Sequence, residues 1–401
     1  MKKLLNFDYA CIQGTYWMLY GILSSFASVF LLSRGYSNSE IGVILAAANV
    51  AAVVLQPLAA DLADRSGRVS LIGITQWMTV MMMVMTIGLF TFQKKSLALS
   101  AIFVLLIAWH TILQPLVNSL NFRLQECGVH INFGMARSLG SLAYSILMAV
   151  LGTVVENHGT GVLPVTGEIV MVMLLISLFV TKRQYDKARR ENLKEVQSRG
   201  EPEEDGEINL ISFVRRNKVF FIVNIGVVGL YFSNSVLNNY MMQIVSDVGG
   251  NSEDMGRILS LMAFLEIPTM FCFDALRRRF SCQLMLKAAA AGFTVKIALC
   301  WAAQSVAMIF AAHLFQLVSF ALFLPAMVHF IDEIMSRGEA VKGQALFTTM
   351  ITVTTVFSSL VGGVILDLSG AKMLTLTATL VTAVGAVIIF LSVDRVKTSR
   401  S

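Results

Sequence analysis

Charged residues are scarce in this sequence. Only 14% of its 401 residues are Asp, Glu, Lys or Arg, whereas soluble domains contain about 25%. The five cysteines are scattered and lack C-x-x-C spacing, so neither a disulfide framework nor a metal site is expected. The chain also lacks a P-loop glycine pattern and a convergent acid–base constellation. These absences exclude ATP-driven transport by this chain alone, and they argue against an enzyme and against a bound cofactor.

Apolar residues dominate the composition instead. They make up 56% of the chain, and the mean hydropathy is +0.71. About 20 apolar residues in a helix cross the ~30 Å hydrocarbon core of a bilayer, and stretches of this length recur along the whole chain. We therefore predict an all-α integral membrane protein in contact with the lipid bilayer. The twelve predicted spans are residues 9–32, 40–60, 69–92, 97–120, 133–155, 162–181, 219–246, 256–275, 284–303, 305–331, 344–366 and 372–393.

Basic residues are unevenly distributed between the two sides of these spans. Of the 31 lysines and arginines, 24 fall on the side that holds both termini and five on the other side. Cytoplasmic loops of membrane proteins carry such an excess. We therefore expect a multi-pass protein of the cell (inner) membrane with cytoplasmic N- and C-termini. The net charge of +6 then reflects topology, and no nucleic-acid partner is expected.

The chain divides around one polar segment. We predict a six-helix bundle over residues 1–181, a cytoplasmic linker over 182–218 and a second six-helix bundle over 219–401. The two halves echo one another, because the triplet Asn-Ser-Glu at 38–40 recurs at 251–253, 213 residues later. Weak internal symmetry of this kind is typical of secondary transporters. The predicted fold is twelve transmembrane helices in two pseudo-symmetric halves.

Polar side chains at helical spacing mark helix faces that are turned toward protein or water. The richest stripes lie on predicted spans 1, 4, 7 and 10, every third helix, as a shared water-filled pathway requires. Amides and aromatic faces suit a polyhydroxylated ligand, although the same residues can also bond neighbouring helices. The residues that we predict to bind a small-molecule solute are Gln13, Trp17, Tyr20, His110, Gln114, Asn118, Arg137, Tyr144, Asn234, Asn238 and Gln316.

Residues 37–68 read SNSEIGVILAAANVAAVVLQPLAADLADRSGR. This stretch resembles the second span and the following loop of the major facilitator superfamily, most closely in the oligosaccharide/proton symporter branch that includes lactose permease. Ala60 replaces the first glycine of the superfamily motif G-x-x-x-D-R-x-G-R. The resemblance implies a transporter fold, and a conformational gate formed by Asp64, Arg65, Gly67 and Arg68.

A second motif supports the same resemblance. Residues 132–140, NFGMARSLG, resemble the branch pattern F-G-x-A-R-x-x-G, which implies that Arg137 is the sugar-binding arginine. In that branch the arginine works with an acidic residue three positions after a proline. Asn118 stands at that position here, in QPLVN. The missing carboxylate argues against lactose-like specificity and leaves an anionic ligand or another hydroxyl pattern open.

Ionisable residues within the spans are candidates for proton coupling. The same resemblance aligns Lys296 with a coupling arginine and His313 with a lysine, while Ser319 replaces the proton-carrying carboxylate of the branch. Glu266 is the best remaining carboxylate at membrane depth. We predict that Glu266 and Lys296 form an ion pair or share a hydrogen-bond network that carries the coupling proton; the alternative is a static structural pair. His313 is a second candidate carrier.

These observations favour a secondary transporter that imports a sugar, glycoside or oligosaccharide by alternating access and proton symport. Uptake of nucleosides or of small aromatic or organic acids is the main alternative, and an uncoupled facilitator remains open. Drug efflux is less favoured, because the fifth span lacks the G-P-x-x-G-G element of the antiporters. A transporter-like sensor is the alternative from another class. We expect the protein to act as a monomer, with the proton as its coupling ion and no cofactor.

Overall fold

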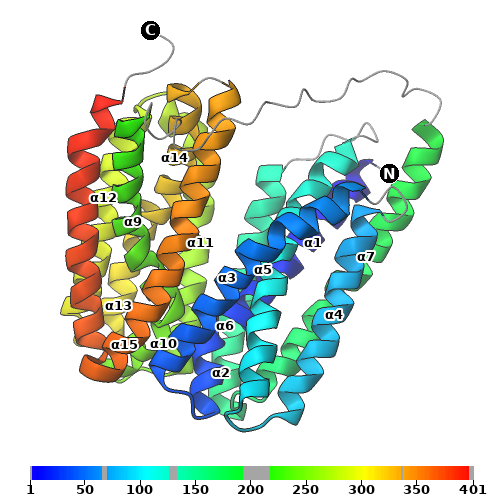
Figure 1. Ribbon diagram of the computed structural model, residues 1–401, viewed down its shortest axis with the longest axis horizontal. Helices are drawn as coiled ribbons and strands as arrows, with labels where there is room; N and C mark the ends of the chain where they lie inside the picture. Colours follow the sequence, from blue (N-terminus) through cyan, green and yellow to red (C-terminus); the bar gives the residue numbers. More distant parts are fainter. Residues whose placement is uncertain (1, 66–69, 126–132, 193–216, 336, 397–401) are drawn as a thin grey trace. The chain divides into compact units, whose positions relative to one another are not determined.

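Helices form all of the regular structure in the part of the chain that is described. The computed structural model describes residues 2–65, 70–125, 133–192, 217–335 and 337–396. The chain divides into two compact units, unit 1 at Met1–Arg199 and unit 2 at Gly200–Ser401 (Figure 1). Each unit forms a helical bundle of its own.

Unit 1 contains a short π-helical turn in addition to its α-helices. In chain order its elements are α1 (Lys2–Tyr20), the π-helical turn Gly21–Ser25, α2 (Ala27–Ser33), α3 (Asn38–Arg65), α4 (Leu71–Thr91), α5 (Leu97–Gln125), α6 (Phe133–His158) and α7 (Val162–Asn192).

Unit 2 contains two short 3₁₀ turns. Its elements are α9 (Lys218–Asn239), α10 (Met241–Asp247), α11 (Ser252–Arg277), α12 (Cys282–Ala302), α13 (Val306–His313), the 3₁₀ turn Leu314–Leu317, α14 (Phe320–Ile334), α15 (Arg337–Ser392) and the 3₁₀ turn Val393–Arg395.

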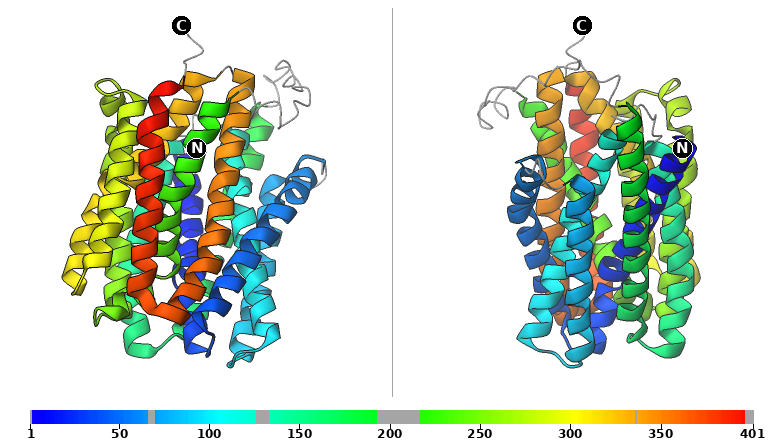
Figure 2. Two further views of the ribbon diagram at one scale, coloured as in Figure 1. Left: turned by 60° about the vertical axis from the view of Figure 1, so that its left-hand side comes forward. Right: turned by 90° about the vertical axis from the view of Figure 1, so that its right-hand side faces the viewer.

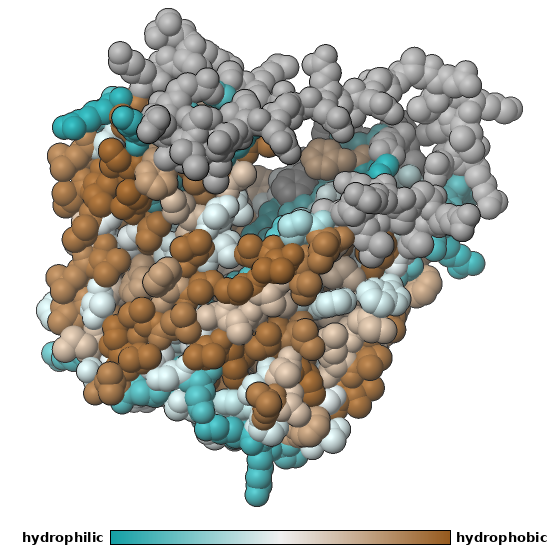
Figure 3. Space-filling model, in the orientation of Figure 1, coloured by the Kyte–Doolittle hydropathy of each residue, from teal (hydrophilic) through white to brown (hydrophobic). Residues whose placement is uncertain are grey.

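The helices are of membrane-spanning length and present apolar side chains outward. Within the described ranges, ten helices are long and apolar enough to cross a bilayer, and a bent pair at the start of the chain makes eleven. Large hydrophobic side chains such as Leu97, Phe271 and Leu368 are more than 60% exposed. Figure 3 shows hydrophobic residues over much of the visible face, with hydrophilic residues mainly near its ends. An exposed apolar surface of this extent marks contact with a membrane or a protein partner. Together with the helices of spanning length, it supports the prediction of a multi-pass membrane protein.

The longest of these helices contains a sharp reversal. Gly370, within α15, has φ 77° and ψ 179°, a conformation that only glycine adopts readily. The chain turns back at this point, so that the two halves of α15 run in opposite directions in Figures 1 and 2. Each half is long enough to cross a bilayer. The predicted count of twelve spans therefore depends on taking α15 as two spans and the bent pair as one.

Both units begin with a broken span, as the predicted internal repeat requires. In unit 1 the π-helical turn separates α1 from the seven-residue α2, with a bend of 42°. In unit 2 the backbone breaks at Tyr240, between α9 and the seven-residue α10. The next helices begin at Asn38 and Ser252. The repeated Asn-Ser-Glu triplet in the sequence thus follows an interrupted first span in both units.

Two predicted boundaries differ from the structure. The sixth span was expected to end at residue 181, but α7 continues to Asn192, because its polar last turns can remain helical in water. The tenth span was expected to be one helix over 305–331, but it is divided into α13, a 3₁₀ turn and α14. The rest of the predicted linker, residues 193–216, lies outside the described residues.

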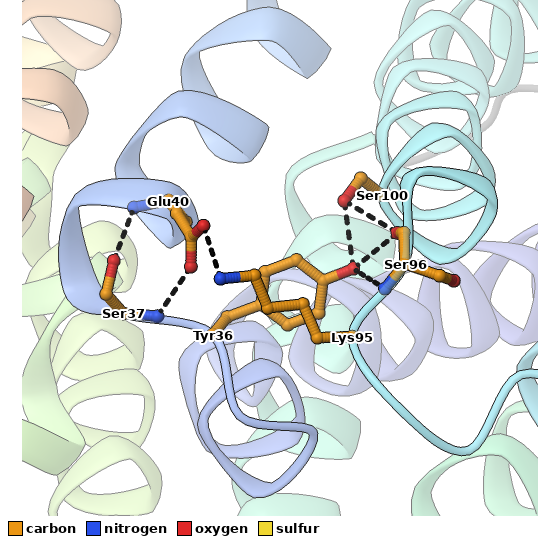
Figure 4. A network of polar contacts seen from close by, with 6 residues as sticks. All are labelled: Tyr36, Ser37, Glu40, Lys95, Ser96 and Ser100. Atoms are coloured by element: carbon orange, nitrogen blue, oxygen red, sulfur yellow. Dashed lines mark hydrogen bonds and ion pairs between the residues drawn. The ribbon is translucent and has the colours of Figure 1, made fainter.

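At one end of unit 1, polar contacts join the segment at the start of α3 to the segment before α5. The ammonium of Lys95, which precedes α5, lies 2.6 Å from Glu40 Oε1 at the start of α3. The hydroxyl of Tyr36 donates to the carbonyl of Ser96 (2.8 Å). Figure 4 shows the Lys95–Glu40 contact on one side of the Tyr36 ring and the contacts of the Tyr36 hydroxyl on the other. We call this set (Tyr36, Glu40, Lys95 and Ser96) the loop clasp. At the matching place in unit 2, Glu253 pairs within its own helix, with Arg257.

Candidate functional site

Five aromatic side chains of unit 1 form a contiguous group, which we call the aromatic cluster. The rings of Tyr16 on α1 and His110 on α5 are stacked, with centroids 4.5 Å apart and planes 9° apart. His110 Nε2 also lies 3.2 Å from the backbone carbonyl of Tyr16. Trp17 meets Tyr16 edge-on at 5.4 Å. Tyr20 lies 5.4 Å from Trp17 and 6.3 Å from Tyr144 on α6. The predicted stripes of spans 1, 4 and 5 therefore meet.

Arg137 on α6 lies against this cluster. Its guanidinium carbon is 3.7 Å from the centre of the Trp17 ring, which is a close cation–π contact. Its Nη1 donates to Ser141 Oγ, one turn along α6, at 2.9 Å. Gly140 makes this approach possible, because a Cβ atom there would lie 2.7 Å from Trp17 Cδ1. The arginine is thus held on an aromatic face and bonded along its own helix.

Amide groups border the same cluster. Gln13 Nε2 donates to Tyr9 OH (2.8 Å) and to Asn118 Oδ1 (3.1 Å) on α5. Among the described residues, Gln13 Oε1 and Trp17 Nε1 are buried without a hydrogen-bond partner. An unpaired buried acceptor and donor each carry a desolvation cost. A ligand hydroxyl can satisfy either atom, since it both donates and accepts. Gln114 lies half-buried on α5, one turn before Asn118.

Unit 2 contains a buried charge in a different setting. Lys296 on α12 is fully buried, and its Nζ donates to Gln316 Oε1 at 2.9 Å. Gln316 Nε2 in turn donates to Glu266 Oε1 on α11 at 3.1 Å. The structure therefore brings Glu266 and Lys296 together through Gln316. We call this arrangement the Lys–Gln–Glu link.

The link passes through the break in the tenth span. Gln316 lies in the 3₁₀ turn between α13 and α14, and mid-helix 3₁₀ turns often mark functional hinges. The carbonyl of Leu317, which lies in this turn, accepts a hydrogen bond from Thr269 Oγ1 of α11 (3.3 Å). Gly292 on α12 lets the helices approach closely, because a Cβ there would lie 3.0 Å from the carbonyl oxygen of Val318. The corresponding span in unit 1, α5, is continuous.

Two buried polar side chains flank this break. His313 donates from Nδ1 to the carbonyl of Ile309 (2.8 Å), which leaves Nε2 as an acceptor in the neutral ring. His313 Nε2 and Ser319 Oγ are both buried without a partner among the described residues. Polar atoms of this kind require water or a ligand.

The two predicted asparagines of α9 differ in their surroundings. Asn234 is buried, and its Oδ1 has no partner in the described part of the chain, whereas Asn238 is half-buried. Their neighbours Ser235 and Asn239 bond Thr355 (3.3 Å) and Ser359 (2.9 Å) of α15. Part of this stripe therefore holds helices together.

The comparisons with known proteins are consistent with this architecture. The model of the MFS_1 like family matches residues 9–377. The chain belongs to this family. No curated protein matches the sequence. It is a transmembrane transporter of the major facilitator type and not an enzyme, because the family and the similar structures are transporters.

Solved transporters share the fold of this MFS chain at low sequence identity. The nucleoside transporter NupG matches with a TM-score of 0.74 and 14% identity, covering 98% of this chain and 100% of that one. A POT family peptide transporter matches with a TM-score of 0.71 and 12% identity, covering 100% and 98%. A bacterial homologue of the human lysosomal transporter Spinster matches with a TM-score of 0.68 and 13% identity, covering 100% and 99%. None of these likenesses selects the lactose-permease-like branch.

The predicted gate of this MFS transporter falls at the limit of what is described. Asp64 and Arg65 form the last turn of α3, and only their backbone is described. Gly67 and Arg68 lie outside the described residues. The gating role therefore stays a prediction.

Sequence reasoning missed three contributors to the site. Tyr9 precedes Gln13 by one helical turn, so its place on the same face was available from spacing. Thr269 follows Glu266 by three residues and was available in the same way. Ser25, which contacts the Tyr144 hydroxyl at 2.9 Å, lies in the π-helical turn, which shifts helical spacing and hides the register.

Proposed function

We propose that this transporter imports a small polar solute with a hydroxylated ring, such as a sugar, glycoside or oligosaccharide, by proton symport. The observation that best supports this proposal is that Arg137 lies on the aromatic face of Trp17. In the same cluster a buried donor, Trp17 Nε1, and a buried acceptor, Gln13 Oε1, have no hydrogen-bond partner among the described residues. An aromatic ring covers the apolar face of a sugar, and amides and arginine bind its hydroxyls.

Proton coupling is assigned to the Lys–Gln–Glu link. An ammonium can only donate and a carboxylate can only accept. The Gln316 amide therefore has a single orientation while Glu266 is ionised, with Oε1 toward Lys296 and Nε2 toward Glu266. Protonation of Glu266 removes the charge assistance of its bond to Gln316. The proton state of Glu266 then changes how tightly α11 holds the turn that divides the tenth span.

The buried charges give this coupling its energetic basis. Lys296 and Glu266 together are close to neutral, so the ionised pair is tolerated at membrane depth. Protonating Glu266 leaves the Lys296 charge uncompensated, which disfavours that state until the conformation or the solute occupancy changes. His313 is a second acceptor beside the same turn, since its Nε2 is buried with no partner in the described residues.

Nucleoside uptake is the second candidate. The aromatic cluster, with Tyr16, Trp17 and Tyr20 in successive contact, offers ring faces on which a nucleobase can stack. NupG, which shares the fold, is a nucleoside transporter.

Two linked experiments test the proposal. Purified protein is screened for thermal stabilisation by sugars, nucleosides, aromatic acids and lipophilic cations. The best stabiliser is then offered to proteoliposomes with and without an inward proton gradient. The proposal predicts stabilisation by a sugar or glycoside, and gradient-driven accumulation of it. Stabilisation by lipophilic cations alone would indicate efflux. Uptake that is the same with and without the proton gradient would indicate an uncoupled facilitator.

A further inference from the structure

Unit 2 has an apolar groove on its membrane-facing surface, away from the site described above. The groove has a volume of about 400 Å³ and lies between α12 and the second half of α15. Its floor contains small side chains, and its walls include outward-facing Val387, Phe390 and Leu391, which are 45–61% exposed. The volume is in the range of ligand pockets, about 300–1,000 Å³. The other lining residues include Ala291, Thr294, Val295, Ala383 and Ala386.

The depth of the groove follows from the pairing of the two helices. Lys287 of α12 forms an ion pair with Asp394, just after α15. The groove begins one turn further into the membrane, at Ala291 and Phe390, which is about 6 Å from the ion pair at 1.5 Å per residue. It reaches Ala383, about 16 Å from Asp394 along the helix. The groove therefore runs from the headgroup level of one leaflet toward the middle of the bilayer.

The charged end of the groove favours an anionic ligand. Lys287 is partly buried, and Arg395, next to Asp394, is exposed. Two cations and one carboxylate leave this end positive. Each lysine or arginine near a membrane surface contributes to binding anionic lipid. By the positive-inside bias this end is cytoplasmic, which is the side where anionic lipids concentrate.

We propose that the groove binds one acyl chain of an anionic phospholipid, with the lipid phosphate held by Lys287 and Arg395. The chain fills the space between α12 and α15, so that Phe390 and Leu391 pack on it rather than on bulk lipid. The headgroup bridges the 3₁₀ turn Val393–Arg395 to the second turn of α12. None of the residues that line the groove is among the proposed solute-binding or proton-coupling residues.

The test measures lipid retention by the full-length protein. Delipidated protein is titrated with dioleoyl phosphatidylglycerol, and bound lipid is counted by native mass spectrometry. Dioleoyl phosphatidylcholine, whose headgroup has no net charge, and dioleoylglycerol, which has no phosphate, serve as controls. Inorganic phosphate tests the headgroup alone. We expect one tightly bound phosphatidylglycerol, and a loss of affinity of about fivefold for each of Lys287→Gln and Arg395→Gln.

A filling substitution tests the acyl-chain part. Ala291→Phe places a ring in the groove, and Ala288→Phe places the same ring one turn earlier on α12, at an exposed position outside the lining. We expect Ala291→Phe to abolish the tightly bound lipid and Ala288→Phe to retain it, with equal yields of folded protein. Equal retention of phosphatidylglycerol and dioleoylglycerol would overturn the proposal. Binding of inorganic phosphate alone in place of the lipid would also overturn it. A dimer of delipidated protein that Ala291→Phe dissociates would overturn it as well.

Discussion

The two units of this transporter hold their central cations in opposite ways. In unit 1, Arg137 is half-buried and lies on the ring of Trp17, whose Nε1 has no hydrogen-bond partner among the described residues. In unit 2, Lys296 is fully buried and bonded through Gln316 to Glu266. The proposed function assigns solute recognition to the first arrangement and proton coupling to the second. We call this proposal the division of labour between the two units.

The fourth span of unit 1 and the matching span of unit 2 also differ in the continuity of their backbone. The fourth span, α5, is one continuous helix that supports His110 and Asn118 on a rigid face. Its counterpart in unit 2 is broken at Leu314–Leu317, where Gln316 lies. A rigid scaffold suits recognition, since it limits the entropy lost on binding. A broken helix suits coupling, because it can take up two arrangements.

The largest effect is expected from removing the carboxylate of the link. A proton gradient of one pH unit stores about 1.4 kcal/mol, enough for about tenfold accumulation at one proton per solute. Glu266→Gln should eliminate that accumulation and leave solute exchange between equal pH compartments intact. Uptake and exchange in proteoliposomes measure the two activities. Glu168→Gln, which removes a half-buried carboxylate on α7, is the control. This variant should accumulate solute like the wild type. Gradient-driven accumulation by Glu266→Gln would remove Glu266 from the proposed mechanism.

Removing the cation of unit 1 should weaken solute binding instead. Arg137→Gln loses both the contact with Trp17 and a charged hydrogen bond to the ligand, so affinity should fall about 10- to 100-fold. Titration of the best-stabilising solute against purified protein measures this loss. Arg123→Gln, an exposed arginine on α5, serves as the control. An unchanged affinity in Arg137→Gln would place recognition elsewhere.

Two glycines offer a matched pair of smaller perturbations. A methyl group at Gly140 meets Trp17, and one at Gly292 meets the Val318 backbone. Gly140→Ala should weaken solute affinity by about tenfold, on the scale of 1–3 kcal/mol for overpacking, without changing the number of protons per solute. Gly292→Ala should lower that number while leaving solute affinity intact. The reverse pattern in transport assays would contradict the division between the units.

The smallest effect is expected at the loop clasp. Glu40 and Lys95 are 40% and 50% exposed, and exposed ion pairs contribute about 0.2–1 kcal/mol. Glu40→Gln should lower the melting temperature by about 1–3 °C, and less at high salt. Glu253→Gln, at the matching position of unit 2, loses only a contact within one helix and should shift it less. A larger shift for Glu253→Gln in a thermal unfolding experiment would show that the clasp does not stabilise unit 1.

Much of the architecture was predictable from hydrophobic length and charge placement. Runs of about 20 apolar residues gave the spans, and the echo between Asn38 and Asn251 indicated the repeat, which appears in the structure as two broken first spans. Aromatic residues predicted on spans 1, 4 and 5 lie in contact in the structure, as expected because a polar residue in lipid must face protein or water. Their role in binding solute stays a prediction.

The remaining features depend on contacts that spacing does not reveal. The break after His313 occurs in LFQLVS, which contains no proline or glycine, and it is supported from outside by Thr269 and Gly292. Gln316 was predicted to bind solute, and its position between Lys296 and Glu266 depends on that break. The reversal at Gly370 was anticipated only as a short gap between two spans.

The number of protons that enter with each solute tests the division of labour most directly. It is measured in proteoliposomes at saturating solute, with an internal pH dye and labelled solute in the same sample. We predict that Arg137→Gln retains the wild-type proton-to-solute ratio once solute is saturating, and that Glu266→Gln moves solute with no protons. A reduced ratio in Arg137→Gln, or an unchanged ratio in Glu266→Gln, would contradict the account.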